Sequence, residues 1–255
     1  MSRPTSPLQP ITISAADCTC QLKRSIIAEL PFLQQLSAED IDAVQALFID
    51  RAFAAGQSIQ VRTSTGNENQ HSLYVVGAGL VKLLRSDSDA HDTVLDILVT
   101  GESFGLDFDH DDLAVSHTNS CVFEIKPADL EQLFRRYPSI PSSLLRLSSS
   151  RITTLHRRLQ LLSGAPARIR IIASLLQLSD KTGTARSRFV PGRSEEILLQ
   201  LPLTRDDLAA FSGTTTETAS RVVSALEREK LIKTGRRWFS LLQPSLLKSE
   251  ISAVI

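Results

Sequence analysis

The feature of this sequence that most constrains its fold is a pair of short helical patterns between Leu203 and Leu226. A turn at Ser212 and Gly213 joins them, and glycine adopts the backbone angles of a tight turn without steric cost. The apolar residues of the second pattern are Ala219, Val222, Val223 and Leu226. Their spacing of three and four residues places them on one face of a helix. Two helices separated by so short a turn predict a helix-turn-helix unit.

The opposite face of the second helix is polar and matches what the major groove of DNA offers. Glu217, Ser220 and Arg221 fall on that face at helical spacing. An arginine can donate two hydrogen bonds to guanine, and a glutamate can accept one from cytosine. We therefore expect this helix to read DNA. Its candidate contacts are Thr215, Thr216, Glu217, Thr218, Ser220 and Arg221.

Two structural interpretations of these residues compete with DNA reading. Thr214 and Glu217 have the spacing of a capping box, in which the glutamate would only satisfy the start of the helix. Arg221 would then be an ordinary solvated surface residue. The complete unit favours DNA reading, because Thr204 can cap the first helix and Gly213 suits the turn.

A hairpin is expected directly after the two helices. The segment from Leu231 to Leu242 has two short apolar runs and predicts a β-hairpin that turns at Gly235. Such a hairpin would be the wing of a winged helix-turn-helix. Basic side chains on a wing are well placed for DNA phosphates, which position a protein on the duplex. The candidates are Lys233, Arg236 and Arg237.

The charges of the chain are divided unequally, although its net charge is zero. Residues 164–255 carry 14 Lys and Arg against 9 Asp and Glu, whereas residues 1–163 carry 14 against 19. The basic part contains the predicted helix-turn-helix, as neutralisation of DNA phosphates favours. The sequence has neither an apolar run of about 18 residues nor the apolar core of a signal peptide. We therefore expect a cytoplasmic protein with no membrane partner.

Changes of pattern along the chain predict an α+β protein of four parts. We expect a flexible N-terminal arm at residues 1–24, a β-roll (jelly roll) sensor domain at 25–134, a dimerisation helix at 135–163 and the DNA-binding domain at 164–255. Short apolar runs separated by glycines and Asn, Asp or Ser clusters predict the strands of the roll. These runs are Ser58–Val61, Leu73–Val76, Leu80–Leu84, Thr93–Leu98 and Cys121–Ile125.

Helices are expected on both sides of the roll. The first runs from Gln21 to Leu30, and a second follows Ser37, which has the character of an N-cap. Gly164 and Pro166 are expected to end the long helix, and another helix follows from Ala167 to about Leu178. A polar loop is expected between that helix and the helix-turn-helix.

The predicted long helix carries an apolar seam without a charged residue. Its members alternate at intervals of three and four over nearly three heptads. They are Leu145, Ser148, Ile152, Leu155, Leu159 and Leu162. Such a helix either packs on its own domain or pairs with its copy. Its place between a β domain and a DNA-binding domain favours pairing, because a two-fold protein can grip two half-sites.

A β-roll, a long helix and a winged helix-turn-helix in this order resemble the cyclic-AMP receptor protein / fumarate–nitrate reduction regulator (CRP/FNR) superfamily. The resemblance covers roughly residues 25–245 and is clearest at Glu217–Arg221, Gly101–Gly105 and Leu30–Leu33. Glu-x-x-Ser-Arg resembles the recognition pattern of the fumarate–nitrate branch, and the cyclic-AMP branch has arginine where this chain has Ser220. The resemblance implies three partners: double-stranded DNA with an inverted repeat resembling TTGAT-N4-ATCAA, a second copy of the chain, and RNA polymerase.

The predicted roll lacks the residues that would hold a cyclic nucleotide. In the cyclic-AMP-binding members that the chain resembles, a Gly-Glu-x-x-Gly turn is followed by an Arg-Ser pair that holds the phosphate. Gly101 and Glu102 are present, but no Lys or Arg occurs between Ser86 and Ile125, where acidic residues gather. A phosphate would meet a negative field there without a cationic clamp. Cyclic AMP is therefore not expected.

Three cysteines are candidates for sensing the signal: Cys18, Cys20 and Cys121. The fumarate–nitrate branch holds a four-iron four-sulfur cluster with three N-terminal cysteines and one in the roll. This chain has two N-terminal cysteines, with a different spacing, and one cysteine in the roll. A cluster would therefore need a fourth ligand such as Asp17 or a histidine. Thiolates also suit other soft metals and redox switching. The remaining interpretations are an inert arm for Cys18 and Cys20, and a core position for Cys121.

These observations favour a regulator controlled by a redox, metal or gas signal. One alternative is a regulator that binds a small ligand in the roll, with incidental cysteines. Another is an enzyme with a cupin-like metal site, which needs clustered histidines. The five histidines of this chain are scattered, so no enzymatic activity is expected.

Overall fold

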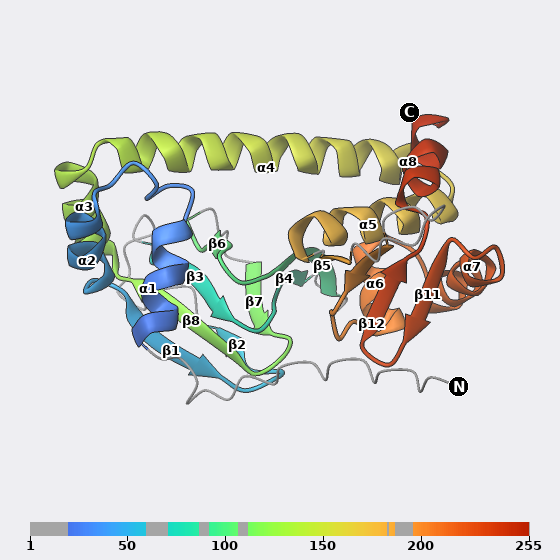
Figure 1. The fold of residues 1–255 in the computed structure, drawn as a ribbon, viewed down its shortest axis with the longest axis horizontal. Helices are drawn as coiled ribbons and strands as arrows, with labels where there is room; N and C mark the ends of the chain where they lie inside the picture. Colours follow the sequence, from blue (N-terminus) through green and yellow to red (C-terminus); the bar gives the residue numbers. More distant parts are fainter. Residues whose placement is uncertain are drawn as a thin grey trace.

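The computed structural model describes residues 20–59, 71–86, 92–106, 112–182, 184–186 and 196–254. An N-terminal β-roll and a C-terminal domain lie side by side, and one long helix runs along both (Figure 1). The expected α+β fold class is confirmed, with a roll, a long helix and a winged helix-turn-helix in that order. None of the helices in these ranges is long and apolar enough to cross a membrane.

The roll consists of two antiparallel sheets with the strand orders β1-β8-β3-β6 and β2-β7-β4-β5. The strands are β1 (Ile49–Phe53), β2 (Ser58–Ile59), β3 (Leu73–Ala78), β4 (Val81–Ser86), β5 (Asp92–Leu98), β6 (Ser103–Phe104), β7 (Asp112–Ser116) and β8 (Ser120–Ile125). The five predicted runs correspond to β2, β3, β4, β5 and β8. Strand β1 has no apolar run, because its three central residues are exposed. For that reason its pattern does not predict a strand.

Three helices pack at one end of the roll: α1 (Cys20–Glu29), α2 (Ala38–Gln45) and α3 (Pro127–Arg136). Helix α2 begins after Ser37 as predicted, since the Ser37 hydroxyl accepts a hydrogen bond from the Asp40 N–H. The arm expected at residues 1–24 ends earlier than predicted. Helix α1 begins at Cys20, and its residues Ile26 and Ile27 are buried against the sheet of β1, β3 and β8. Residues 1–19 lie outside the described residues.

Helix α4 (Ser139–Gly164) runs along the upper side of the molecule in Figure 1. The single helix expected from residue 135 is two helices, because Tyr137 leaves the helical conformation at the end of α3. The end of α4 at Gly164 agrees with the prediction. Ile140 and Ser143 in its first turns are buried, and Ile140 belongs to the same apolar cluster as Ile26 and Ile27 of α1.

The C-terminal domain contains α5 (Ala167–Thr182), β9 (Thr184–Arg186), β10 (Glu196–Leu199), α6 (Arg205–Phe211), α7 (Thr216–Arg228), β11 (Ile232–Gly235), β12 (Trp238–Leu241) and α8 (Pro244–Ser252). Its sheet has the order β11-β12-β10-β9, so the wing hairpin continues into two more strands. The loop predicted before the helix-turn-helix is therefore partly wrong. Apolar residues of β10 pair with β12 there, and β9 covers the other edge of β10.

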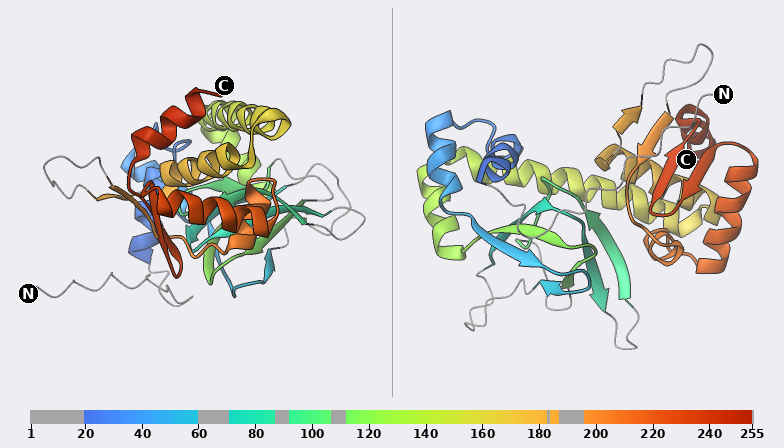
Figure 2. Two further views of the ribbon diagram at one scale, coloured as in Figure 1. Left: turned by 90° about the vertical axis from the view of Figure 1, so that its right-hand side faces the viewer. Right: turned by 60° about the horizontal axis from the view of Figure 1, so that its bottom comes forward.

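One apolar cluster crosses from the roll into the C-terminal domain. Val94 and Ile97 of β5 belong to the same cluster as Leu208 and Phe211 of α6. The views in Figure 2 show the C-terminal domain lying against the β4–β5 side of the roll. The two domains therefore form one packed unit in this structure, and a change in the roll can reach the helix-turn-helix directly.

Candidate DNA-binding site

Helices α6 and α7 with the turn between them form the predicted helix-turn-helix. The Thr204 hydroxyl accepts a hydrogen bond from the Asp207 N–H, and the Asp207 carboxylate accepts one from the Thr204 N–H, which completes a capping box. Gly213 in the turn has a φ of 61°. A Cβ there would lie 2.5 Å from Cδ2 of Leu162 in α4. The cap and the turn are confirmed, and both the positive φ and the close approach require glycine.

The N-terminus of α7 separates the two interpretations of Glu217. The N-cap is Thr215, whose hydroxyl accepts a hydrogen bond from the Thr218 N–H at 3.2 Å. The capping box of Thr214 with Glu217 is therefore wrong, because the helix begins one residue later. Glu217 instead lies 3.8 Å from Arg221, one turn further along the helix. The buried residues of α7 are Ala219, Val223 and Leu226.

The outward face of α7 is open to solvent. The side chains of Glu217 and Arg221 are 81% and 71% exposed, and Ser220 is half-buried. Thr216 has a further role, because its hydroxyl donates to the Asp206 carboxylate at 2.6 Å and ties α7 to α6. A helix held by its apolar face, with charged side chains on the other, is the arrangement that a DNA groove accepts.

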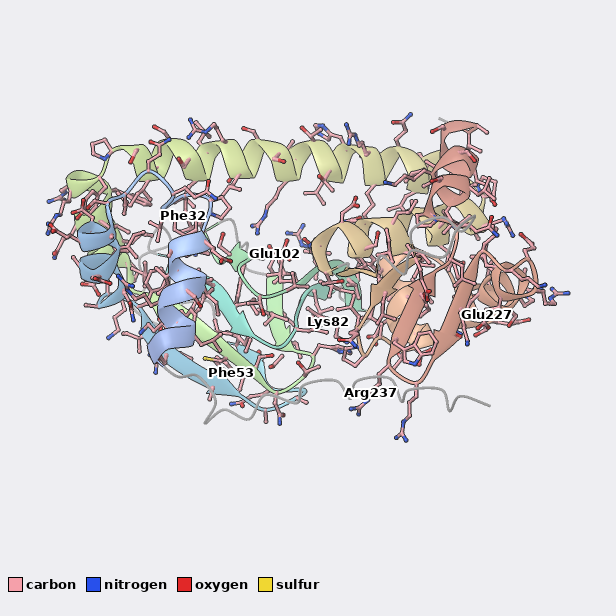
Figure 3. All side chains as sticks on the ribbon, in the orientation of Figure 1. Phe32, Phe53, Lys82, Glu102, Glu227 and Arg237 are labelled. Carbon is pink, nitrogen blue, oxygen red and sulfur yellow. The ribbon has the colours of Figure 1, made fainter. Side chains whose placement is uncertain are left out.

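The wing is the hairpin of β11 and β12. Its turn residues are Arg236 and Arg237, directly after the predicted position, because Gly235 still pairs with Trp238. A Cβ on Gly235 would come within 2.2 Å of the Trp238 ring, so glycine makes room for the indole. Figure 3 shows Arg237 at the tip of the hairpin. The side chains of Arg236, Arg237 and Lys233 are all exposed.

Arg205, the first residue of α6, is a further candidate site residue that the sequence does not single out. Its guanidinium donates to Thr234 Oγ1 on the wing at 3.2 Å and lies 5.3 Å from the centroid of the Phe239 ring. Burial lowers the pKa of Arg205, although a guanidinium keeps its charge. This residue adds a cation beside the wing arginines. The signal in the sequence is its place after the N-cap Thr204, since a helix start favours phosphate.

The predicted seam of α4 is uncovered. Its large apolar side chains are 39–70% exposed, and Ser148 is exposed as well. A row of exposed apolar residues along one helix marks an interaction surface. The five large residues are Leu145, Ile152, Leu155, Leu159 and Leu162.

Arg158 of α4 connects the long helix with both domains. Its guanidinium donates to the carbonyl oxygens of Val94 and Leu95 in β5. It also donates to the Phe211 carbonyl at the end of α6, at 2.6 Å, and lies 4.3 Å from the centroid of the Phe211 ring. Burial lowers the pKa of Arg158, and the nearby Asp96 carboxylate partly opposes this effect. One side chain therefore touches the roll and the helix-turn-helix at once.

A second contact between the domains is centred on Asp207. Lys82 of β4 donates to its carboxylate at 2.9 Å, and His117 Nε2 lies 3.6 Å away. Figure 3 shows Lys82 at the boundary between the roll and the C-terminal domain. Burial raises the pKa of Asp207, but hydrogen bonds from Thr204 and Lys82 outweigh it, so the pKa lies below its usual value. The same carboxylate thus caps α6 and holds it against the roll.

A third contact joins α5 and α4 to the segment Gly101–Gly105, which carries part of the family resemblance. Lys181 at the end of α5 donates to the Asp96 carboxylate at 2.8 Å and to the Glu102 carboxylate at 3.2 Å. Arg151 of α4 donates to the Ser103 carbonyl. Two carboxylates of the acidic part of the roll, Asp96 and Glu102, are therefore paired with a lysine of the helix packed on them.

The predicted cysteine site falls mostly outside the described residues. Cys18 and the side chain of Cys20 are not described, whereas Cys121 is buried on β8 and is disulfide-bonded. Among the described residues no group of three His, Cys, Asp or Glu side chains is arranged to hold a metal ion. A sulfur in a disulfide bond is not a thiolate. Cys121 therefore does not fit an iron–sulfur cluster or another thiolate-bound metal in the form seen here.

Comparisons with known proteins agree with this geometry. A family model described as a Crp-like helix-turn-helix domain matches residues 169–250. The "Cyclic AMP receptor protein" of Thermus thermophilus is 29% identical over 223 residues, which are 86% of this chain and 95% of that protein. The "Fumarate and nitrate reduction regulatory protein" of Vibrio cholerae is 23% identical over 235 residues, 90% of each chain.

A solved structure shares the fold. The structure of FixK2 from Bradyrhizobium japonicum aligns with a TM-score of 0.67 at 20% sequence identity. The alignment covers 79% of this chain and 96% of that chain. The fold of this chain is therefore shared with a protein of low sequence identity.

Proposed function

We propose that this chain, which belongs to the CRP/FNR superfamily of DNA-binding transcription regulators, reads an inverted repeat resembling TTGAT-N4-ATCAA as a homodimer and acts on RNA polymerase. The outward face of α7 is the observation that carries the proposal. Glu217 and Arg221 are exposed on that face, with Ser220 between them. Glutamate and arginine can read cytosine and guanine respectively. The other predicted contacts of α7 support its first turn, Thr215 and Thr218 through the cap and Thr216 through Asp206.

The seam of α4 supports the homodimer. It is uncharged and exposed from Leu145 to Leu162, so a second copy can cover it along its whole length. Two recognition helices would then be related by a two-fold axis, which matches the symmetry of an inverted repeat. The wing side chains Lys233, Arg236 and Arg237, together with Arg205, would contact the phosphates on each half-site.

The contacts of α4 and α5 with the roll supply a route for the signal. Arg158, Arg151 and Lys181 all reach the segment from β5 to β6. Arg158 also holds the end of α6. A rearrangement of this segment would therefore move the helix-turn-helix relative to the dimer helix, and that movement sets the spacing of the two recognition helices.

We propose that the sensor responds to a redox signal through its thiols. Cys121 is buried beside α1, the helix that starts at Cys20, and is disulfide-bonded. We propose that its partner is Cys18 or Cys20. Two thiols and a peroxide would give the disulfide and two waters, and a dithiol reductant would reverse the step. A metal held by Cys18, Cys20 and reduced Cys121, and a small ligand in the roll, are the alternatives.

Base reading is tested with Arg221→Ala in the full-length protein. We expect a loss of about 1–3 kcal/mol in binding to duplex DNA that carries the inverted repeat, with little change on scrambled DNA. Arg228→Ala is the matched control, because Arg228 is an exposed arginine in the last turn of the same helix. Equal losses on both DNA sequences for Arg221→Ala would remove this residue from the reading face.

The redox signal is tested with three single Cys→Ser variants. DNA affinity is measured by fluorescence anisotropy after peroxide and after dithiothreitol. We expect wild type to differ between the two treatments, and Cys121→Ser to give one affinity. One of Cys18→Ser and Cys20→Ser should behave like Cys121→Ser. A normal response in all three variants would favour the small-ligand alternative, and a response lost to a chelator would favour the metal.

A further inference from the structure

A cleft of about 1110 Å³ lies between the roll and the C-terminal domain, and it shares the wing arginines and Arg205 with the candidate DNA-binding site. The roll contributes turn residues to its wall, among them Ala55, Gly79 and Thr118. The C-terminal domain contributes the start of α6 and the tip of the wing. The volume is slightly above the range for pockets that bind small molecules, roughly 300–1,000 Å³.

The ionisable side chains that line the cleft are all basic: His117, Lys181, Arg205, Arg236 and Arg237. Lys181 and His117 already face carboxylates of Asp96 and Asp207. In the part of the chain that the structure describes, Arg236 and Arg237 have no ion-pair partner, whereas Arg205 donates to Thr234 and lies in the field of the Glu227 carboxylate. Two unpaired guanidiniums at the wing, with Arg205 beside them, form a site for a multiply charged anion, because a guanidinium can donate two hydrogen bonds to an anionic group.

The rest of the cleft wall suits an organic body. Leu80, Val99 and Leu203 provide apolar contacts, while Thr100, Thr118 and Gln200 provide uncharged hydrogen-bonding groups. An inorganic ion would leave this part unfilled. The cleft therefore offers apolar contacts to the body of a ligand and polar groups to its charged ends.

We propose that this cleft binds a small organic anion with more than one negative charge, a phosphate ester or a polycarboxylate. The anionic groups contact Arg205, Arg236 and Arg237, and the body lies against the roll. The inference rests on the proposed function in one respect, since the same arginines are expected to contact DNA phosphates. A bound anion holds the C-terminal domain on the roll and competes with DNA, so it acts as an inhibitor of DNA binding.

Calorimetry on the full-length protein tests the anion site, with pyrophosphate and citrate as probes and sodium chloride of equal ionic strength as the reference. We expect saturable binding of at least one probe. Which of the two binds distinguishes the phosphate from the carboxylate source. Arg236→Ala combined with Arg237→Ala should weaken binding about tenfold or more. Lys233→Ala removes an exposed wing cation outside the cleft lining, and it should change binding by less than about twofold.

Ala55 gives a test that leaves the arginines and the whole C-terminal domain intact. Ala55→Glu places a carboxylate on the roll wall of the cleft, and Ala55→Gln is the uncharged control of the same size. We expect Ala55→Glu to weaken probe binding about tenfold and Ala55→Gln to leave it near wild type. Equal probe binding by the two variants would overturn the proposal that the anion binds in the cleft, because the roll wall would then not be near the bound anion.

DNA binding separates failure of this inference from failure of the proposed function. Without a probe, Ala55→Glu and wild type should bind the inverted repeat alike. With the binding probe, wild type should lose more affinity for DNA than in sodium chloride of the same ionic strength. Normal DNA binding with no saturable probe binding overturns the anion site alone. Absence of specific DNA binding in wild type overturns the proposed function.

Discussion

The outward face of α7 and the junction between the two domains hold charged side chains in opposite ways. On α7, Glu217 and Arg221 are 81% and 71% exposed. At the junction, the side chains of Lys82 and Asp207 are 20% and 9% exposed and pair at 2.9 Å. Exposed charges keep their hydration until a partner arrives, so they are available for recognition. Largely buried paired charges fix two surfaces in one register, since separating them leaves each one poorly solvated.

The largest expected effect comes from a change that separates the two α7 helices of the proposed dimer and lies outside both of them. Leu155→Asp places like charges across the proposed two-fold axis at the centre of the α4 seam. Because each half-site alone binds weakly, we expect the protein to become monomeric and lose roughly a hundredfold or more in affinity for the inverted repeat. Sedimentation and fluorescence anisotropy measure the two effects.

Thr154→Asp is the control for Leu155→Asp, because Thr154 is an exposed residue of the same helix turn outside the seam. It should remain dimeric and bind the repeat normally. If Leu155→Asp sediments as a dimer, the interface lies elsewhere and the exposed seam needs another partner.

The next effect is on the free energy of unfolding, and it distinguishes the junction between the two domains from the reading face of α7. Arg158→Ala leaves the carbonyl oxygens of Val94, Leu95 and Phe211 without their donor. We expect the free energy of unfolding to fall by about 3 kcal/mol in urea denaturation. Arg157→Ala removes an exposed neighbouring arginine and should cost less than about 0.5 kcal/mol. Similar losses in both variants would mean that Arg158 does not hold the domains together.

The two regions also differ in how far the sequence predicts them. The face of α7 follows from spacing within one helix, and the caps at Thr204 of α6 and Thr215 of α7 depend on residues three positions away. Arg158 meets Val94 and Phe211 across 64 and 53 residues. No local pattern encodes such a pairing, because it depends on how the domains pack. Strand β1 illustrates the same limit, since its exposed centre carries no periodic signal.

A smaller effect separates phosphate contact from base reading within the DNA-binding domain. Arg236→Ala should weaken binding to specific and random DNA by similar factors, since a wing arginine contacts only the backbone. The slope of log affinity against log salt should become shallower by about 0.9 for the one phosphate lost. Titrations at several salt concentrations measure the slope. A change confined to the specific sequence would instead give the wing a role in base reading.

The smallest effect is the pH dependence of the junction. The pKa of Asp207 is lowered in the folded protein by Thr204 and Lys82, against the opposing effect of burial. A group with a lowered folded pKa stabilises the fold above its unfolded pKa, about 4 for aspartate, and this stability is lost as the pH falls through the folded value. We therefore expect the stability difference between wild type and Asp207→Asn to be largest near neutral pH and to shrink in acid. Denaturation at several pH values measures it, with Asp180→Asn, an exposed aspartate of α5, as the control. A difference that does not shrink in acid would mean that the carboxylate charge does not hold α6 to the roll.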